Sequence, residues 1–464
     1  MTTTIPRDKW PDWIKERMKG RKNVEVKERN GNFYLYEYQH IWDKKLKRAM
    51  KTTRYVGVIK RCGGRVYEHG HVAFLLGLFE RHGIVEKLRK HFPNEWPELL
   101  TFSLNRVIYP FPLKRIGSWS EKTTLWKFLG EGGFSGKQLS RALAEVGTNV
   151  EGQTEFMREL ITNGEMLIYD KSVIFSDSNH NRLLEIGYDP DELFLPKANV
   201  TLLFSKERNV PVHFRVIFGS VHEIRTITAI MGEIRQKGLI FIGDKAFYEN
   251  NLYDDLDEGG VRFILPLPRD DARIRYRRKL PGVFEYRDRI VKCTAYHVRP
   301  YHFYLYEDQR LKYEQTSEYY RLKLKRRRVT FNEEWAGKIA LISNMELGPK
   351  EVYLMWKTRD RIEKAFNVLQ NLLQTDHPYV SREEVFRGYL FGSFISLFAY
   401  YLVLNLLQKH KINDRVSVED LLFEFSKVML EDRKPPLLAE IPKKVQDLSR
   451  KLGVYNIVTK IWES

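Results

Sequence analysis

The segment at residues 356–370 constrains this chain most, because its residues separate by type around a helix. At 100° per residue, one flank of that helix is apolar and the stripe beside it is polar. The apolar flank consists of Ile362, Phe366, Leu369 and Leu373. The polar stripe, roughly 60° wide, consists of Trp356, Arg359, Glu363 and Gln370. The segment therefore predicts a helix that presents one carboxylate, Glu363, beside a cation and an aromatic ring.

Two earlier stretches of the chain end an apolar run on an aspartate. Residues 167–169 are followed directly by Asp170, and residues 239–242 are followed by Gly243 and Asp244. Continuous apolar runs of this length are typical of buried strands, so each aspartate is expected at the edge of a sheet. Two strand-end aspartates and a helix glutamate can converge at such an edge.

Three converging carboxylates suit phosphodiester chemistry. Two divalent ions about 3.5 to 4 Å apart can activate a water or hydroxyl and neutralise the charge on a phosphate. Mg²⁺ prefers carboxylate oxygens and retains several waters, so Asp170, Asp244 and Glu363 form a sufficient cage. Each acid also has a simpler interpretation. A strand-end aspartate often caps a turn, and Glu363 four residues after Arg359 is a typical surface pair.

The net charge of +18 is concentrated in two segments. Residues 1–70 and residues 268–331 each hold 18 Lys and Arg against 8 Asp and Glu, a net charge of +10 per segment. A general surplus for solubility would be spread evenly, so the clustering predicts two surfaces aimed at a polyanion. Nucleic acid is the first candidate and an anionic membrane is the second.

Composition limits the class of protein. A chain of 464 residues with 43% hydrophobic and 30% charged residues is long enough for two to four domains and is expected to be soluble and globular. Cys62 and Cys293 form no zinc spacing and no disulfide framework, which fits a reducing cytoplasm. The polar start of the chain predicts no signal peptide. Residues 388–407 carry no charge, and we expect a buried core helix there rather than a membrane span.

The pattern along the chain predicts four regions. Residues 1–70 form a basic β-hairpin arm, with Asn30-Gly31 as the tight turn between residues 24–26 and 33–36. Residues 71–160 are helical and are a candidate DNA-end-binding domain, with a capping box that begins a helix at Ser135. Residues 161–410 alternate in an α/β manner around a β-rich insertion at 268–335, and residues 411–464 form a helical tail.

The strands and helices of the α/β region are expected at specific positions. The strand candidates are 166–170, 172–176, 199–205, 211–218, 239–243, 262–266 and 338–343, with a helix at 223–236. The insertion interleaves aromatic residues with arginines and reads as short strands, and Arg326, Arg327 and Arg328 lie near its exit.

In their order and context these residues resemble the DDE transposases of bacterial and archaeal insertion sequences. The insertion-sequence-four group has the spacing Tyr, two residues, Arg, three residues, Glu, six residues, Lys. Trp356, Arg359, Glu363 and Gln370 occupy those four positions with the spacing intact, although Trp replaces the usual Tyr and Gln replaces the usual Lys. The contexts of Asp170 and Asp244 also resemble the first and second acid motifs of the family.

The resemblance implies a ribonuclease-H-like mixed-sheet core that binds Mg²⁺, with Mn²⁺ expected to substitute. It also implies binding to terminal inverted repeats, cleavage at the element ends and strand transfer into target DNA. Asp170, Asp244 and Glu363 would be catalytic metal ligands, whereas Trp356, Arg359, Gln370 and Arg326 to Arg328 would contact DNA. The expected protein is cytoplasmic and nucleoid-associated, forms a homodimer on double-stranded DNA and does not act at a membrane. The alternatives are a metal-dependent nuclease without strand transfer and a non-catalytic DNA-binding protein derived from a transposase.

Overall fold

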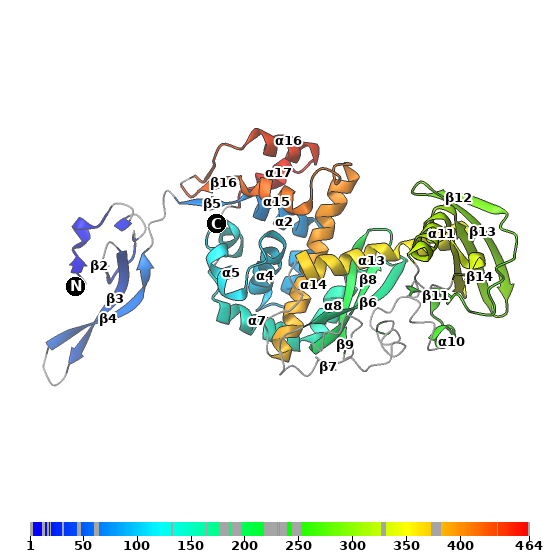
Figure 1. Ribbon diagram of the computed structural model, residues 1–464. Helices are drawn as coiled ribbons and strands as arrows, with labels where there is room; N and C mark the ends of the chain where they lie inside the picture. The colour runs from blue at the N-terminus through cyan, green and yellow to red at the C-terminus, as the bar shows by residue number, and fades with distance from the viewer. Residues whose placement is uncertain are drawn as a thin grey trace.

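Figure 1 shows the computed structural model of the chain. The structure describes residues 3–11, 14–15, 18, 20–29, 32–43, 48–59, 65–130, 133–163, 165–175, 185–186, 196–217, 230, 232, 239–243, 252–325, 331–372, 382–433 and 435–462. Asp244, the run Arg326 to Arg328 and nearly all of the helix predicted at 223–236 lie outside these residues.

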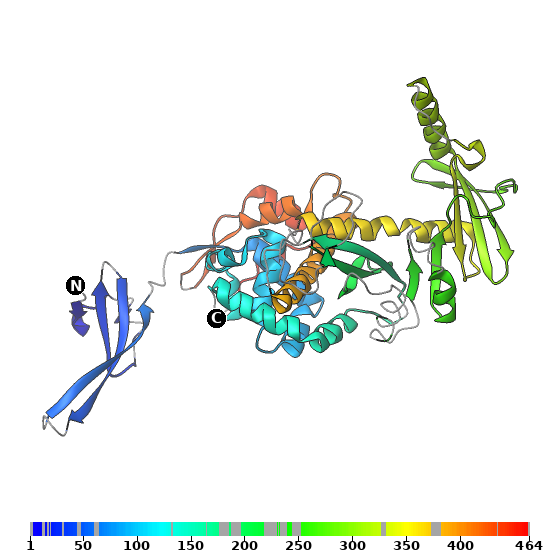
Figure 2. The same ribbon diagram turned by 60° about the horizontal axis from the view of Figure 1, so that its bottom comes forward.

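The N-terminal region is a four-stranded antiparallel sheet in the order β1-β2-β3-β4. Its strands are β1 (Thr3–Ile5), β2 (Val24–Arg29), β3 (Asn32–Asp43) and β4 (Arg48–Ile59). The predicted hairpin is confirmed, because Arg29 pairs with Asn32 across a two-residue connection. The sheet has a small hydrophobic core of its own and stands apart from the rest of the chain (Figures 1 and 2). That core comprises Trp10, Ile14, Met18, Val24, Val26, Leu35 and Ile59.

Residues 70–158 form a packed set of helices, as the sequence predicts. They are α2 (Gly70–Arg81), α3 (Ile84–His91), α4 (Trp96–Ile108), α5 (Leu113–Ser120), α6 (Leu125–Leu129), α7 (Gly136–Thr148) and α8 (Val150–Arg158). The capping box is present, with Ser135 and Gln138 bonded reciprocally at the start of α7. Leu139, Leu143 and Val146 are fully buried, whereas Lys137 and Arg141 on the same helix are exposed.

The C-terminal residues return to this helical region. They form α15 (Val418–Ser426), β16 (Met429–Glu431), β17 (Leu437–Leu438), α16 (Lys443–Lys451) and α17 (Tyr455–Val458). Strand β16 pairs antiparallel with β5 (Val66–Glu68), which precedes α2. Phe425 of α15 packs edge-on against Phe74 of α2, with ring centroids 5.0 Å apart. The segments before and after the central sheet therefore close on each other.

The central feature is a mixed sheet in the order β12-β13-β14-β15-β11-β10-β6-β8-β7, with β9 paired to β8. Its strands are β6 (Leu167–Phe175), β7 (Glu185–Ile186), β8 (Pro196–Ser205), β9 (Val210–Ile217), β10 (Leu239–Ile242), β11 (Arg262–Pro266), β12 (Gly282–Tyr286), β13 (Arg289–Val298), β14 (Tyr301–Asp308) and β15 (Lys338–Ser343). Strand β10 runs parallel to both β6 and β11. The prediction of separate strands at 166–170 and 172–176 is wrong, because Lys171 continues the ladder with Thr201 and makes β6 a single strand.

The insertion extends this sheet and is only partly β-structured. Strands β12 to β14 confirm part of the prediction, but Gln309–Leu324 form the helix α11, which the interpretation as short strands missed. The carboxylate of Asp308 caps the helix by accepting the Leu311 amide at 2.9 Å, and Arg310 bonds Glu314 one turn later. Helix α11 projects from the insertion (Figure 2), and none of its residues is buried. A short helix, α10 (Leu252–Glu258), precedes β11.

The uncharged stretch lies in α14 (Glu383–Lys409). Within the described part of the chain this is the single helix long and apolar enough to cross a membrane, and 72% of its most apolar window is buried inside the fold. It packs against α7, α4 and β9. The prediction of a buried core helix is therefore confirmed.

Candidate active site

The prediction that Asp170 ends a strand is wrong, because β6 continues to Phe175 and Asp170 is only its fourth residue. The shorter neighbouring strand β10, which is parallel to β6, does end beside Asp170. Phe241 of β10 pairs with Tyr169 of β6, and β10 ends one residue later, level with Asp170. The Tyr169 and Phe241 rings, one residue before this level of the sheet, pack 5.1 Å apart. Asp244 follows β10 by two residues but lies outside the described residues, so its side chain is not placed.

Asp170 is held in a nearly buried position. Its relative exposure is 5%, although the residue belongs to β6 next to a solvent-facing helix. The backbone amide of Lys171 donates to Asp170 Oδ1 at 2.9 Å, which fixes the orientation of the carboxylate. A buried carboxylate of this kind needs a nearby positive charge to remain ionised.

The helix that carries Glu363 is interrupted at two places. Residues 349–372 form α12 (Pro349–Lys357), α13 (Arg359–Asn367) and the π-helical turn η4 (Val368–Leu372). The prediction of one regular helix over 356–370 is therefore wrong. The Thr358 hydroxyl donates to the Met355 carbonyl, a side-chain bond that competes with the helical ladder. The expected apolar flank is nevertheless buried at Ile362, Phe366 and Leu369, whereas Leu373 lies outside the described residues.

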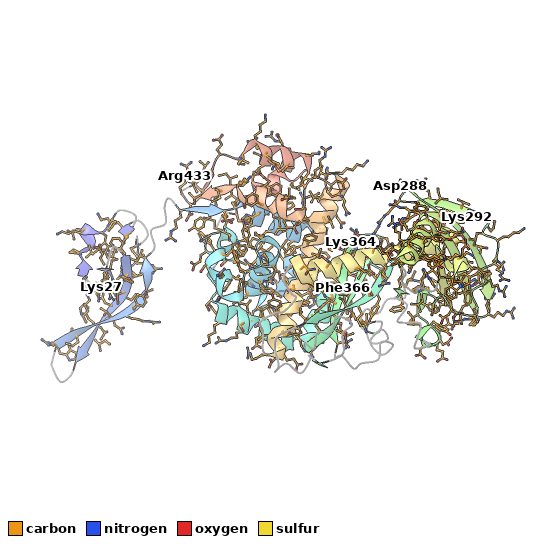
Figure 3. All side chains as sticks on the ribbon, in the orientation of Figure 1. Lys27, Asp288, Lys292, Lys364, Phe366 and Arg433 are labelled. Atoms are coloured by element: carbon orange, nitrogen blue, oxygen red, sulfur yellow. The ribbon has the colours of Figure 1, made fainter. Side chains whose placement is uncertain are left out.

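Arg359 joins two of the predicted acids. Its Nε lies 3.8 Å from Asp170 Oδ2, and its Nη2 lies 2.9 Å from Glu363 Oε1. The Arg359 side chain is 20% exposed, while that of Glu363 is 54% exposed. The pair from Arg359 to Glu363 is thus present, but the arginine also reaches the sheet. Figure 3 labels Lys364 and Phe366, which mark α13 beside the sheet.

Gln370 reaches the same strand from the π-helical turn. Its Nε2 donates to Ser172 Oγ at 3.3 Å. Because alternate residues of a strand share a face, Ser172 and Asp170 lie on the same side of β6. Arg359 and Gln370 therefore both lie beside the part of β6 that carries Asp170 and Ser172. This is the arrangement expected if the polar stripe faces one site. Sequence reasoning missed Ser172, although its position two residues after Asp170 was a usable signal.

Trp356 occupies a different environment. Its ring lies 6.0 Å from that of Tyr353, and the Lys357 ammonium lies 4.5 Å from the Trp356 centroid. Tyr353 in turn packs against Phe284, Tyr286 and Tyr306 of the insertion strands. These described contacts connect Trp356 with the insertion rather than with Asp170.

The described residues fit a divalent cation in part. Asp170 and Glu363 are oxygen donors of the type that Mg²⁺ prefers, and Arg359 already places a positive charge between them. Within the described ranges, no group of three or more His, Cys, Asp or Glu side chains is suited to hold a metal. The position that would complete the predicted set, Asp244, lies outside those ranges.

Fold and site together define a mixed α/β protein in which Arg359 joins a strand aspartate, Asp170, to a helix glutamate, Glu363. Residues 170–399, just under half of the chain, match the family described as Transposase DDE domain. The prediction of a DDE-type transposase is supported at this level. A cryo-EM structure of the piggyBac transposase synaptic complex with hairpin DNA is similar to the chain at 11% identity, with a TM-score of 0.40. The similarity covers 86% of this chain and 88% of that one. No curated protein matches the chain.

Proposed function

We propose that this protein is a DNA transposase of the insertion-sequence-four-like group. It binds the terminal inverted repeats of an insertion sequence, cleaves the phosphodiester at the element ends and joins those ends to target DNA by metal-dependent phosphoryl transfer. The observation that carries the proposal is the bridge from Asp170 through Arg359 to Glu363, within residues matched by the Transposase DDE domain.

The proposal includes a ribonuclease-H-like core. Five neighbouring strands in the order β9-β8-β6-β10-β11 support it. Strand β8 pairs antiparallel with both β9 and β6. Strand β10 pairs parallel with both β6 and β11. Strand β10 ends at Ile242, level with Asp170 within β6, and Asp244 follows β10 by two residues in sequence.

Each site residue has a proposed role. Asp170, Asp244 and Glu363 would hold Mg²⁺ or Mn²⁺. Divalent ions in such a site activate the attacking oxygen and neutralise charge on the phosphate. Arg359 orients the Glu363 carboxylate through its 2.9 Å contact and balances the charge of Asp170. Gln370 is held beside the site by Ser172.

The DNA contacts and the surroundings of the enzyme are also proposals. Trp356 stacks on a base or sugar, and Arg326, Arg327 and Arg328 contact phosphates. The helical residues 71–160 bind the element end, for which the exposed Lys137 and Arg141 of α7 are suitable. We propose that the protein acts as a homodimer on double-stranded DNA in the cytoplasm, associated with the nucleoid.

The test is an assay of the whole chain with duplex DNA taken from the flanks of its coding region. Paired inverted repeats there identify the element ends. We expect joined products with Mg²⁺ or Mn²⁺ and none with a chelator. Nicks without joining would indicate a metal-dependent nuclease instead, and binding without any cleavage would indicate a DNA-binding protein derived from a transposase.

A further inference from the structure

The two faces of the N-terminal sheet differ in character. Side chains alternate across a strand. Leu35 and Val26 therefore point to one face, where with Ile59 they enter the small core. The opposite face carries four tyrosines and two lysines, which we call the tyrosine face. These are Lys27 of β2, Tyr34, Tyr36 and Tyr38 of β3, and Lys51 and Tyr55 of β4. Glu25 and His40 lie on the same face.

Three rings of the tyrosine face, those of Tyr34, Tyr36 and Tyr55, form a continuous group. Tyr55 pairs with Tyr36 across the strands, with ring centroids 5.4 Å apart, and lies 6.4 Å from Tyr34. Tyr55 is 52% exposed, so one side of the group is open to solvent. The outward face of an antiparallel sheet is normally polar, and an aromatic one therefore calls for a ligand.

Lysine ammonium groups lie directly on these rings. Lys27 Nζ is 4.2 Å from the Tyr36 centroid, and Lys51 Nζ is 4.4 Å from the Tyr38 centroid. Figure 3 labels Lys27 on this sheet. Glu25 is 7% exposed and pairs with both lysines, which holds their positions. The face therefore offers ordered cations at the level of the rings, in a segment of 70 residues with a net charge of +10.

Ordered cations beside exposed rings are the two components of a single-strand binding surface. Phosphates pair with the lysines, while unpaired bases stack on the aromatic rings. A duplex offers phosphates as well, but its base faces are hidden within the helix. A protein partner would not require the positive charge. We propose that the tyrosine face binds single-stranded DNA, with a base stacked on Tyr55 and phosphates at Lys27 and Lys51.

The choice of DNA over RNA rests on the proposed function, because strand cleavage at an element end exposes unpaired DNA. The binding itself does not depend on catalysis. The experiment measures fluorescence anisotropy of a labelled twelve-nucleotide oligo(dT) with the full chain, over a range of salt concentrations. Tyr55→Ser should weaken binding by at least about fivefold, the lower limit for loss of one stacked base. Lys51→Ala should reduce the slope of log affinity against log salt by about 0.7.

The opposite face of the same strands supplies matched controls. Arg54 neighbours Tyr55 but lies on the other face, and it pairs with Glu37. Arg54→Ala removes the same charge as Lys51→Ala and should leave the oligo(dT) affinity within about twofold. Thr52, which is also exposed on that face, gives a second control. Thr52→Ala tests whether any substitution in strands β3 and β4 weakens oligo(dT) binding. Circular dichroism of every variant should match that of the wild type.

Four results would overturn the proposal. Oligo(dT) affinity that is equal in Tyr55→Ser and wild type would remove the stacking role. An equal effect of Tyr55→Ser on duplex binding would make the face a duplex reader, and preference for oligo(U) over oligo(dT) would assign it to RNA. Loss of self-association in Tyr55→Ser without loss of oligo(dT) binding would assign the face to a second copy of the chain. If cleavage fails while oligo(dT) binding depends on Tyr55, the proposed function is wrong and this inference stands.

Discussion

Arg359 sets the electrostatics of the candidate site at the scale of single residues. Its guanidinium lies within 3.8 Å of the nearly buried Asp170 and donates to the exposed Glu363. A divalent cation bound by these carboxylates would take over part of the charge that Arg359 now balances. We therefore expect Arg359 to respond to metal binding, and the two carboxylates to be replaceable without unfolding the chain.

The first prediction concerns the three acids. Asp170→Asn, Asp244→Asn and Glu363→Gln should each reduce DNA cleavage by about 100-fold or more, because a lost ligand charge removes metal affinity. End binding should stay within about twofold, since duplex affinity comes mainly from Lys and Arg contacts to phosphates. Gel assays of cleavage and of binding measure the two effects.

Asp255→Asn serves as the control for the acid variants, because Asp255 lies exposed on α10. Its cleavage rate should equal that of the wild type. Near wild-type cleavage by any one of the three acid variants would exclude that acid from the site.

The second prediction concerns Gln370, which lies next to Ser172 on the strand that carries Asp170. Gln370→Lys should add a charge-assisted contact to a phosphate of the bound DNA end, worth about 1.5 to 3 kcal/mol at most. The end-DNA dissociation constant should therefore fall, by up to about ten- to 150-fold. Ser172→Ala is the control, since it removes the hydrogen bond without adding charge. Unchanged affinity in Gln370→Lys would show that position 370 does not face the DNA.

The sequence predicts contacts within one helix better than contacts between distant segments. The spacing of Arg359 and Glu363 identified their pair, because i,i+4 residues are always neighbours on a helix. The contacts of Arg359 with Asp170 and of Gln370 with Ser172 join segments about 190 to 200 residues apart, and no local pattern encodes them. Trp356 has the expected spacing but packs toward the insertion, because Tyr353 links it to those strands.

Helices α7 and α14 cross with their backbones close together. A Cβ added to Gly388 would lie 1.8 Å from the Leu143 carbonyl oxygen, and one added to Gly147 would lie 1.8 Å from the Glu384 carbonyl oxygen. Both helix backbones therefore meet without side chains between them. This crossing joins the helical region to the helix that supports β9.

The third prediction tests that crossing. Gly388→Ala should lower the free energy of unfolding by about 3 kcal/mol or more, because the backbones must separate to admit a methyl group. Chemical denaturation measures the change. Gly348→Ala, at the exposed start of α12 where no atom lies within 4 Å, should change it by less than about 1 kcal/mol. Equal stability of both variants would mean that the helices do not cross this closely.

The sequence pattern failed for one helix break and for one whole helix. Apolar residues recur at helical spacing on both sides of Thr358, so this spacing could not reveal the helix break between α12 and α13. The break lies where the Thr358 hydroxyl bonds the Met355 carbonyl. Helix α11 was missed because its aromatic residues favour strands, while its Asp308 cap and its pair of Arg310 with Glu314 favour a helix. With no buried residue in α11, no apolar stripe marked it.

The fourth prediction concerns the junction of β5 and α2, where two histidines are buried. Burial lowers the pKa of His69 to about 4 and that of His71 to about 3. His69 Nδ1 lies 2.9 Å from Thr124 Oγ1, and His71 Nε2 lies 3.4 Å from Glu68. Burial also raises the pKa of Glu68, so the neutral forms of both partners are favoured.

As pH falls below about 6.5, the unfolded chain takes up protons that the folded chain refuses. The free energy of unfolding should therefore be greatest above pH 6.5 and decrease toward pH 4, by up to about 1.4 kcal/mol per pH unit for each histidine. Glu68 acts in the opposite sense, so the informative comparison is between wild type and His71→Phe. Urea denaturation at pH 7 and pH 5 should show a smaller change in the free energy of unfolding in the variant than in the wild type. An equal change would show that His71 does not contribute to the pH dependence.

At the scale of the whole molecule, the excess positive charge lies in two separate segments. One is the N-terminal sheet with its own core, and the other is the insertion at the far end of the central sheet (Figure 1). The sequence located both segments because charge is local in the chain. It did not predict the return of the C-terminal residues to α2, since the pairing of β16 with β5 joins positions more than 360 residues apart. Short strands that pair so far apart carry little local signal.

The last prediction assigns the charge of the insertion to DNA. Replacing Arg326, Arg327 and Arg328 together with Ala should reduce the slope of log end-binding affinity against log salt by up to about two to three units, at roughly 0.9 per phosphate contact. The insertion lacks the arrangement typical of membrane binding, a helix with its aromatic residues on one buried face. Helix α11 instead has exposed Tyr313 and Tyr320 beside basic residues.

The control for this triple variant removes three exposed lysines outside both basic segments, Lys409, Lys443 and Lys451. It has the same net charge as the arginine variant, so a general effect of charge would flatten both slopes equally. We expect the control to keep the wild-type slope, because counterion release requires direct contact with phosphates rather than net charge at a distance. A wild-type slope in the arginine variant, or loss of its binding to anionic liposomes instead of DNA, would contradict the assignment of the insertion to DNA.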